Sequence, residues 1–340
     1  RYVAVEYGQA GYEPHPASEI FKNKYGDCKD KAILLVTMFK EAGLVAYPVL
    51  ISTDKSVNLI PELPATLFNH CIAALELEDK TVFLDPTAQT CSFGDLPLSD
   101  QSRKVLGFAP GGYKILETPL FPPEHNSIRQ ELNIKVNKNE GITAEKKNYT
   151  RGFFDQAQRY WLLFTQPELI QDTLNSVAQE ISIGAKVNKY KIDNLDDLNK
   201  PVVLAYDFSG DEFFTVSGSL RILPQLASVN TALVSKLKRR YPVDLGLLDV
   251  KEEYLEIDLP KGLIVKNMPD NLSEESPWSE VKVEYGYKNN KIFFRQETRT
   301  KKKIISQSDY AAFKAFLEKA ARRAKQRVIL EKADDEKAKN

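Results

Sequence analysis

The chain has 340 residues, of which 42% are hydrophobic, so it is long enough to bury a sizeable core and to favour two domains over one. Its 47 Lys and Arg residues balance 47 Asp and Glu residues, so net charge gives no reason to expect nucleic acid or an anionic membrane as a partner. No apolar stretch reaches the roughly 18 residues that a membrane-spanning helix needs.

The first part of the chain, residues 1 to about 120, alternates strand and helix patterns. Residues 1–8, "RYVAVEYG", predict a strand. Because residue 1 already lies in this strand, we expect the chain to be a fragment or the processed part of a longer protein, with any export signal upstream. Residues 28–42 predict a helix with Asp27 as N-cap and Gly43 just past its end. Its middle, "AILLVTMF", is apolar nearly all round, which predicts a central, buried helix.

Two further strands and a boundary follow. After a strand in "LVAYPVLIST" and a polar loop up to residue 67, "NHCIAALEL" and "TVFLDPT" predict a hairpin that turns at Glu78 and Asp79. The proline-rich stretch 117–127, "ETPLFPPEHNS", is the best candidate for a boundary. We therefore expect an α+β domain over residues 1–120 and a second domain over residues 121–340.

The second domain is predicted to be rich in strands. Hairpin patterns occur in "IRQELNIKVN" with "GITAEKKNYT" and in "VKVEYGYKNNKIFFRQETRT". Helices are expected near residues 153–183 and from about residue 308 to residue 327, followed by a frayed tail.

The cysteines predict neither a disulfide framework nor a metal site. There are only three, Cys28, Cys71 and Cys91, and an odd, sparse set does not form such a framework. No C-x-x-C motif occurs and only three histidines are present, so we expect no structural zinc, no other metal and no cofactor.

Cys28 has the position expected of a reactive cysteine. As the first residue after the N-cap Asp27, it lies where the helix dipole stabilises a thiolate, and Lys29 adds positive charge. Its backbone N–H has no acceptor within the helix and could donate to an oxyanion. Gly26 is expected to let a substrate backbone approach. The alternative is that Cys28 is a small buried hydrophobic residue.

A thiolate needs a base and a group that orients the base. Of the three histidines, His15 lies between prolines and is expected to brace a turn, and His125 lies in the proline-rich connector. His70 begins a strand. A two-residue loop at 78–79 pairs residues whose numbers sum to 157, which places Asp85 on the same face as His70 and diagonal to it.

Each residue of this pair also has a structural interpretation. His70 could be a buried histidine without a catalytic role, and "LDPT" around Asp85 is a good strand-ending turn. Cys71 points to the opposite face and is expected in the core, and Cys91 is interpreted as structural.

The motifs "YGDCKDKAILL", "FNHCIAAL" and "FLDPTA", in this order, resemble the transglutaminase-like superfamily. They are most similar to bacterial proteins in which a β-rich domain of unknown function precedes a transglutaminase-like core. The resemblance implies an α+β fold with a papain-like core, in which a helix packs on an antiparallel sheet, followed by a β-rich C-terminal domain with inserted helices. On this scaffold it implies a Cys-His-Asp triad, with Cys28 as nucleophile, His70 as base and Asp85 as orienting group. It also implies an upstream side chain that completes the oxyanion hole, and the sequence does not choose between Gln9 and Tyr12.

These features predict a thiol-dependent amide-bond enzyme that forms a thioester. Water would make it a peptidase or amidase, which the resemblance favours, and an amine would make it a transglutaminase-type acyl transferase. The expected partners are a protein or peptide substrate and an upstream β-rich domain of the same chain, at a periplasmic or extracellular location that the resemblance alone implies. The alternative is a non-catalytic extracellular binding or scaffold protein. A thiol-ligated metal site ranks third because the ligand spacing is wrong.

Overall fold

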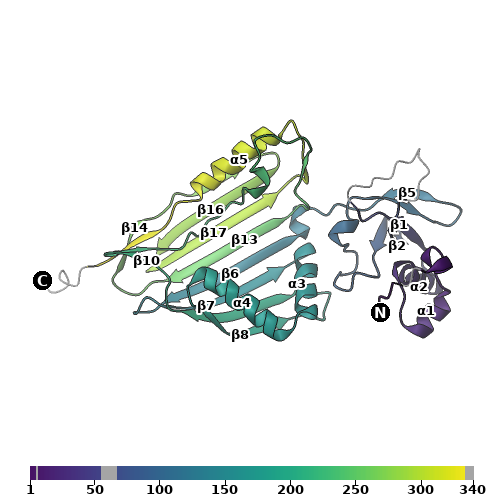
Figure 1. Ribbon diagram of the computed structural model, residues 1–340, viewed down its shortest axis with the longest axis horizontal. Coiled ribbons are helices and arrows are strands. Elements are labelled where there is room, and N and C mark those ends of the chain that lie inside the picture. The colour runs from purple at the N-terminus through teal and green to yellow at the C-terminus, as the bar shows by residue number, and fades with distance from the viewer. Residues whose placement is uncertain (5–6, 55–66, 334–340) are drawn as a thin grey trace. The chain divides into compact units, whose positions relative to one another are not determined.

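The computed structural model describes residues 1–4, 7–54 and 67–333 (Figure 1). The chain divides into two compact units, residues 1–121 and 122–340, and the division falls inside the proline-rich stretch. Helices and antiparallel sheets are mixed, and the C-terminal region is rich in strands, so the fold is α+β. Within the described residues, no helix has both the length and the apolar character needed to span a membrane.

The first unit is built on one antiparallel sheet with the strand order β3-β2-β1-β4-β5. In the described part of this unit, two helices and two short 3-10 turns accompany the sheet. The elements are η1 (Gly8–Gly11), α1 (Ala17–Asn23), α2 (Cys28–Glu41), β1 (Ala46–Ile51), β2 (His70–Leu77), β3 (Lys80–Leu84), η2 (Leu98–Asp100), β4 (Lys104–Gly107) and β5 (Lys114–Glu117).

Both faces of this sheet are buried, which explains the almost continuous apolar run of β2. Ala73 and Leu75 pack with Val36 of α2, whereas Ile72 and Ala74 belong to the cluster on the opposite face. The prediction of a central, buried helix holds for only one side of α2. The helix covers one face of the sheet, and its far side is exposed, with Met38 at 54%. The apolar residues of α2 therefore cover more of the helix surface than the side that packs on the sheet.

Three other predictions are changed or fall outside the described residues. Among the described residues of the stretch 1–8, the structure has an isolated bridge between Tyr2 and Gly26, and η1 begins at Gly8. Residues 5 and 6, most of the loop predicted up to residue 67, and residues 334–340 of the tail lie outside the described residues.

The second unit is dominated by a sheet of eight strands in the order β15-β16-β17-β13-β6-β7-β9-β8. Among the described strands of this sheet, β13 and β6 are parallel and the other neighbours are antiparallel. The strands are β6 (Ser127–Val136), β7 (Ile142–Thr150), β8 (Lys186–Asp193), β9 (Val203–Gly210), β13 (Val250–Asp258), β15 (Leu272–Glu275), β16 (Ser279–Lys288) and β17 (Lys291–Thr300).

Smaller elements complete this unit. A four-stranded sheet has the order β10-β11-β19-β14, and β12 pairs with β18. The remaining elements are η3 (Pro123–His125), α3 (Phe153–Phe164), α4 (Pro167–Ile181), β10 (Thr215–Ser217), β11 (Leu220–Ile222), η4 (Ala232–Val234), β12 (Val243–Asp244), β14 (Leu263–Asn267), β18 (Ile304–Ile305), α5 (Tyr310–Arg323) and β19 (Ile329–Lys332).

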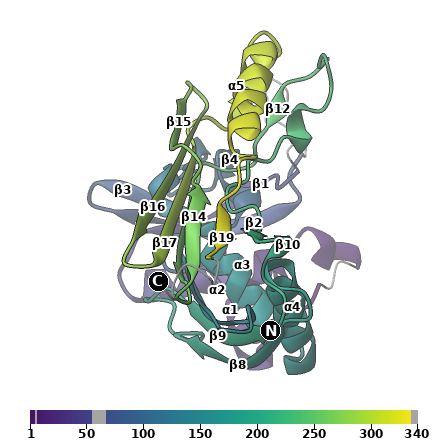
Figure 2. The same cartoon turned by 90° about the vertical axis from the view of Figure 1, so that its left-hand side faces the viewer.

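The helices of the second unit cover one face of its large sheet (Figure 2). Leu162 of α3 and Leu174 of α4 pack with strand residues such as Ile134, and Ala320 of α5 packs with Phe294. Because side chains alternate along a strand, the neighbours of these buried residues lie on the other face. Among the described residues, that face carries charged and aromatic side chains such as Arg129, Tyr254 and Arg295.

Candidate thiol site

Cys28 is the first residue of α2, and the structure shows how the sequence starts the helix there. Asp27 is the N-cap, and its carboxylate accepts from the N–H of Asp30 at 3.2 Å. The carboxylate of Asp30 in turn accepts from the N–H of Asp27 at 3.4 Å, which completes a capping box. Cys28 is partly exposed. The amide N–H groups of Cys28 and Lys29 have no acceptor within the helix.

Asp30 also ties this helix end to the segment before α1. Its carboxylate accepts from the backbone N–H of His15 at 2.9 Å and lies 3.1 Å from the imidazole Nδ1, so His15 braces this junction. Gly26 has a packing role that the sequence pattern did not predict. A Cβ on Gly26 would lie 2.6 Å from the Cβ of Asp30, so the glycine makes room for that capping side chain, and its expected role in substrate approach stays a prediction.

The hairpin of β2 and β3 has the register that the two-residue loop predicted. Leu77 pairs with Lys80 and Ala73 with Leu84, and continuing this register places Asp85 diagonal to His70. The side chains meet: Nε2 of His70 lies 3.1 Å from Oδ2 of Asp85. Thr87 donates to the other carboxylate oxygen of Asp85, from its N–H at 2.8 Å and its hydroxyl at 2.7 Å.

The environment of His70 favours the imidazolium. Burial by itself disfavours the charged ring, but hydrogen bonds with Asp85 and Cys28, together with the charges of Asp85 and Asp100, raise the pKa of His70 to about 10. Since Nε2 faces Asp85, Nδ1 is the ring nitrogen that remains for the thiol of Cys28. Burial raises the pKa of Asp85, but the hydrogen bond and charge of His70 outweigh it and hold that pKa below its usual value.

The other two cysteines lie in different environments. Cys71 is 5% exposed, and burial together with the nearby Cys28 raises the pKa of its thiol to about 12. Burial and three aspartates raise the pKa of Cys91 even further. Burial and neighbouring negative charge both disfavour a thiolate, so neither Cys71 nor Cys91 has the properties of a nucleophile.

The sequence pattern missed one acidic residue of the site, Asp100. It lies in η2 and is 1% exposed, and one of its oxygens comes within 4.8 Å of a ring nitrogen of His70 and an oxygen of Asp85. Carboxylates and an imidazole at this spacing are also donors that a divalent cation can use. Since His70 and Asp85 are joined by a hydrogen bond, we interpret the three groups as a proton-sharing cluster. The only signal in the sequence was a charged residue within the apolar "LPLSDQ".

The two candidates for a second oxyanion donor lie in or next to η1. Gln9 donates to the carboxylate of Glu13, and Tyr12 extends into solvent with 93% of its surface exposed. The positions of Gln9 and Tyr12 do not show which of the two would be the second oxyanion donor.

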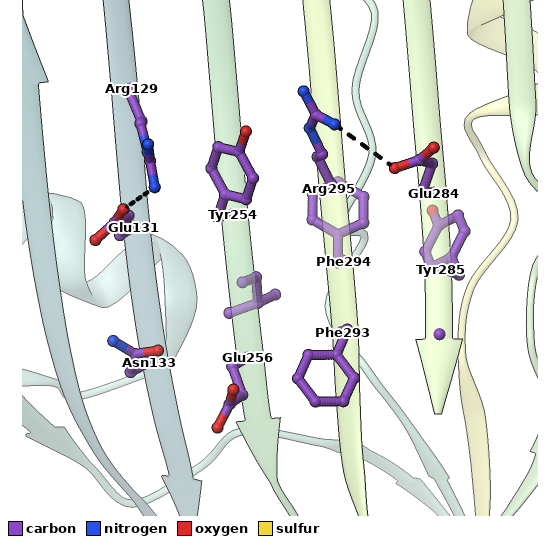
Figure 3. A pocket seen from close by; sticks show the side chains of 12 residues that line it. Arg129, Glu131, Asn133, Tyr254, Glu256, Glu284, Tyr285, Phe293, Phe294 and Arg295 are labelled. Atoms are coloured by element: carbon purple, nitrogen blue, oxygen red, sulfur yellow. Dashed lines mark hydrogen bonds and ion pairs between the residues drawn. The ribbon is translucent and has the colours of Figure 1, made fainter. Parts of the chain in front are cut away.

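A second feature lies on the open face of the large sheet in the other unit. Figure 3 shows Arg129, Tyr254 and Arg295 side by side on β6, β13 and β17. The guanidinium carbons of the two arginines lie 4.7 Å and 5.3 Å from the ring centre of Tyr254. A hollow of about 460 Å³ includes these residues and is also lined by Glu131, Asn133, Leu255, Glu256, Glu284, Tyr285, Gly286, Phe293 and Phe294.

Comparisons with known proteins support the fold. A family model for a domain of unknown function, DUF3858, matches residues 219–330, which is less than half of the chain. A search of curated proteins gave no match. Among solved structures, the chain is similar to a "putative protease" from Parabacteroides distasonis ATCC 8503, with a TM-score of 0.52 and 12% identity over 94% of this chain and 47% of that one. The chain thus spans about half the length of that protein, and the likeness concerns the fold alone.

Proposed function

We propose that the protein is a thiol-dependent amide-bond enzyme with Cys28 as nucleophile, His70 as general base and acid, and Asp85 as orienting group. One observation carries this proposal. Nε2 of His70 lies 3.1 Å from Oδ2 of Asp85, and Cys28, at the start of α2, is close enough to the imidazole to help raise its pKa. A nucleophile, a base and a third group that orients the base are the parts that acyl transfer needs.

The reaction would proceed in two balanced steps. In the first, a bond forms between Sγ of Cys28 and the substrate carbonyl carbon, the C–N bond breaks, and His70 gives the thiol proton to the leaving amine. In the second, His70 takes a proton from the attacking water as the water oxygen bonds to the same carbon, and the thioester C–S bond breaks. The acid product leaves, and the thiol recovers its proton from His70.

The start of α2 would stabilise the oxyanion of each step. The N–H groups of Cys28 and Lys29 lie at the positive end of the helix dipole, and the capping box fixes that end in place. A second donor, from Gln9 or Tyr12, remains part of the proposal.

Hydrolysis is favoured over transfer to an amine. The resemblance to the transglutaminase-like superfamily allows both, while the fold is shared with a protein described as a "putative protease". We therefore propose a peptidase or amidase with a papain-like core, acting on a protein or peptide outside the cytoplasm. An amine acceptor in place of water would give transglutaminase-type chemistry at the same site.

The test is to trap the acyl-enzyme. The protein would be incubated with a library of peptide amides, quenched in acid and analysed by mass spectrometry, which should locate a thioester on Cys28. Cys28→Ala should abolish the adduct, and the matched control Cys91→Ala should retain it. Adducts spread equally over the three cysteines, or an active Cys28→Ala variant, would contradict the proposal.

A second candidate, a non-catalytic binding protein, is favoured by the open sheet face of Figure 3. The hollow around Tyr254 exposes aromatic carbon beside paired charges, a composition that suits binding. Peptide binding that is lost in Tyr254→Ala but unchanged in Cys28→Ala, without turnover, would favour this function. The three groups at Cys28, His70 and Asp85 argue against it, because a scaffold has no need to keep them together.

A further inference from the structure

Asp100 is buried in a way that needs an explanation. Its side chain is 1% exposed, and Oδ1 accepts from the hydroxyl of Ser99 at 2.8 Å. Its other oxygen, Oδ2, is buried and has no hydrogen-bond donor among the described residues. A buried carboxylate oxygen without a donor is costly, so a fold that served packing alone would gain from a neutral residue here.

The backbone holds Asp100 firmly in this position. Its N–H donates to the carbonyl of Pro97 at 3.0 Å, and its own carbonyl accepts from the hydroxyl of Thr118. Thr118 is itself 1% exposed and pairs with Arg103. The η2 turn is therefore fixed from two sides, and the carboxyl of Asp100 is held next to the proposed triad.

The charged groups that act on this carboxyl come from several elements. His70 lies on β2 and Asp85 just after β3, and both interact with Asp100. Cys91, in the loop before η2, experiences the charge of Asp100, and Lys31 of α2 experiences that of Asp85. Burial, followed by the charge of Asp85, raises the pKa of Asp100 to about 6.

Two protonation states follow from this arrangement. When protonated, Asp100 can donate a hydrogen bond to Asp85, and this interaction helps to raise its pKa. When ionised, Asp100 adds a second negative charge near the ring of His70, which favours the imidazolium. The two carboxyls thus share one proton at low pH and jointly stabilise the imidazolium at higher pH.

We propose that Asp100 is a positioning residue of the thiol site, which acts through Asp85 and His70 to hold the imidazolium beside Cys28. This inference rests on the proposed function, because it assigns a part to Asp100 in the same site. Cys28 reaches its most reactive pH range as Asp100 ionises. The negative charge of Asp100 then extends that range to higher pH, because it stabilises the imidazolium of His70.

The test uses Asp100→Asn, which has the same shape and can donate to Asp85 at every pH, as the protonated acid does. The rate of Cys28 alkylation by iodoacetamide would be measured from pH 4 to 11, together with the titration of the His70 ring by NMR and the melting temperature. We expect the inflection near pH 6 to disappear. We also expect the titration of His70, and the high-pH change in the rate of Cys28 alkylation, to move to lower pH by about one unit or more, because the charge of Asp100 no longer stabilises the imidazolium.

Two further variants separate charge from packing. Gln101→Leu changes the neighbouring side chain, which is 1% exposed, without changing charge, so it should alter the melting temperature without moving either limb. Ser99→Ala removes a hydrogen bond that lowers the pKa of Asp100, so it should move the inflection near pH 6 upward. Ser99→Ala also provides a test if Asp100→Asn does not fold.

The outcomes are distinct. A folded Asp100→Asn protein whose His70 titration and rate profile match the wild type overturns the role of Asp100, even if Cys28 is the nucleophile. The role of Asp100 is also overturned if Gln101→Leu shifts the pH profile of Cys28 alkylation as much as Asp100→Asn does, because packing would then explain the effect. A wild type in which Cys28 shows no preferential alkylation contradicts the proposed function itself, whatever Asp100 does.

Discussion

At the scale of single residues, the three cysteines differ in ways that the sequence only partly indicates. Cys28 is partly exposed beside an imidazole, whereas Cys71 is buried in β2 and Cys91 is surrounded by aspartates. Burial and neighbouring negative charge raise the thiol pKa of the latter two. Reactivity should therefore differ far more than exposure does.

We predict that iodoacetamide at pH 7 alkylates Cys28 roughly 100-fold or more faster than Cys71 or Cys91, because thiolate is the reacting species. Peptide mapping by mass spectrometry over a time course measures all three rates in one sample. A urea-unfolded sample is the control, in which the three rates should converge. Similar rates in the folded protein would remove the basis for a nucleophile at Cys28.

The pKa of His70 makes stability depend on pH in a known direction. Because the folded-state pKa of about 10 lies above the unfolded value of 6.5, its contribution is fully present below pH 6.5 and is lost as pH rises through 10. We predict that wild type exceeds His70→Gln in free energy of unfolding by on the order of 3 kcal/mol near pH 6.5, and that the difference shrinks toward pH 10.5.

Urea unfolding of both proteins at intervals of one pH unit measures this difference. His125→Gln, in the second unit, is the control. A difference between wild type and His70→Gln that is independent of pH would show that His70 contributes through packing and not through its charge.

At the scale of elements, the hairpin shows how far local rules reach. The two-residue loop at 78–79 fixes the register, and the register places His70 and Asp85 on one face, so their approach was predictable. The start of α2 followed in the same way from Asp27 as N-cap, whereas the capping box with Asp30 was not predicted. Asp100 was not predictable, because it arrives from η2, and no local period connects that turn to β2.

A buried ion pair anchors α3 in the second unit. Arg159 is fully buried, contacts Asp155 at 2.5 Å and donates to the carbonyls of Asn194 and Leu195 at 2.6 Å and 2.5 Å. Asp155 also accepts from the N–H of Val202 at 2.7 Å. The pair thus holds the loop between β8 and β9 against the helix.

We predict that Arg159→Met lowers the free energy of unfolding of the second unit by about 3–5 kcal/mol, because it leaves Asp155 buried without its partner. Thermal and urea unfolding measure the loss. Arg151→Met, at an exposed arginine just before the same helix, is the matched control and should change stability by less than about 0.5 kcal/mol. Equal losses in the two variants would contradict the anchoring role.

At the scale of the whole molecule, each hydrophobic cluster of the described residues belongs to one unit. Val36, Tyr47 and their neighbours form the clusters of residues 1–121, and Phe208, Phe294 and Phe313 lie in those of residues 122–340. A unit with its own core can unfold by itself.

We therefore predict two transitions in calorimetry of the full chain. His70→Gln should lower only the transition of the first unit, and Arg159→Met only that of the second, because each residue contacts its own unit. A single transition that both variants shift together would contradict independent unfolding.

The sequence by itself determined the α+β character, the strand-rich C-terminal region, the start of α2 at Cys28 and the register that unites His70 with Asp85. Each of these depends on short-range rules of capping, alternation and turn length. Only the tertiary structure decided that the far side of α2 is exposed, that Gly26 makes room for Asp30, and that Asp100 lies within 4.8 Å of the imidazole. These features depend on segments distant in the chain that share one buried space, and burial and charge there are set by neighbours that no local pattern encodes.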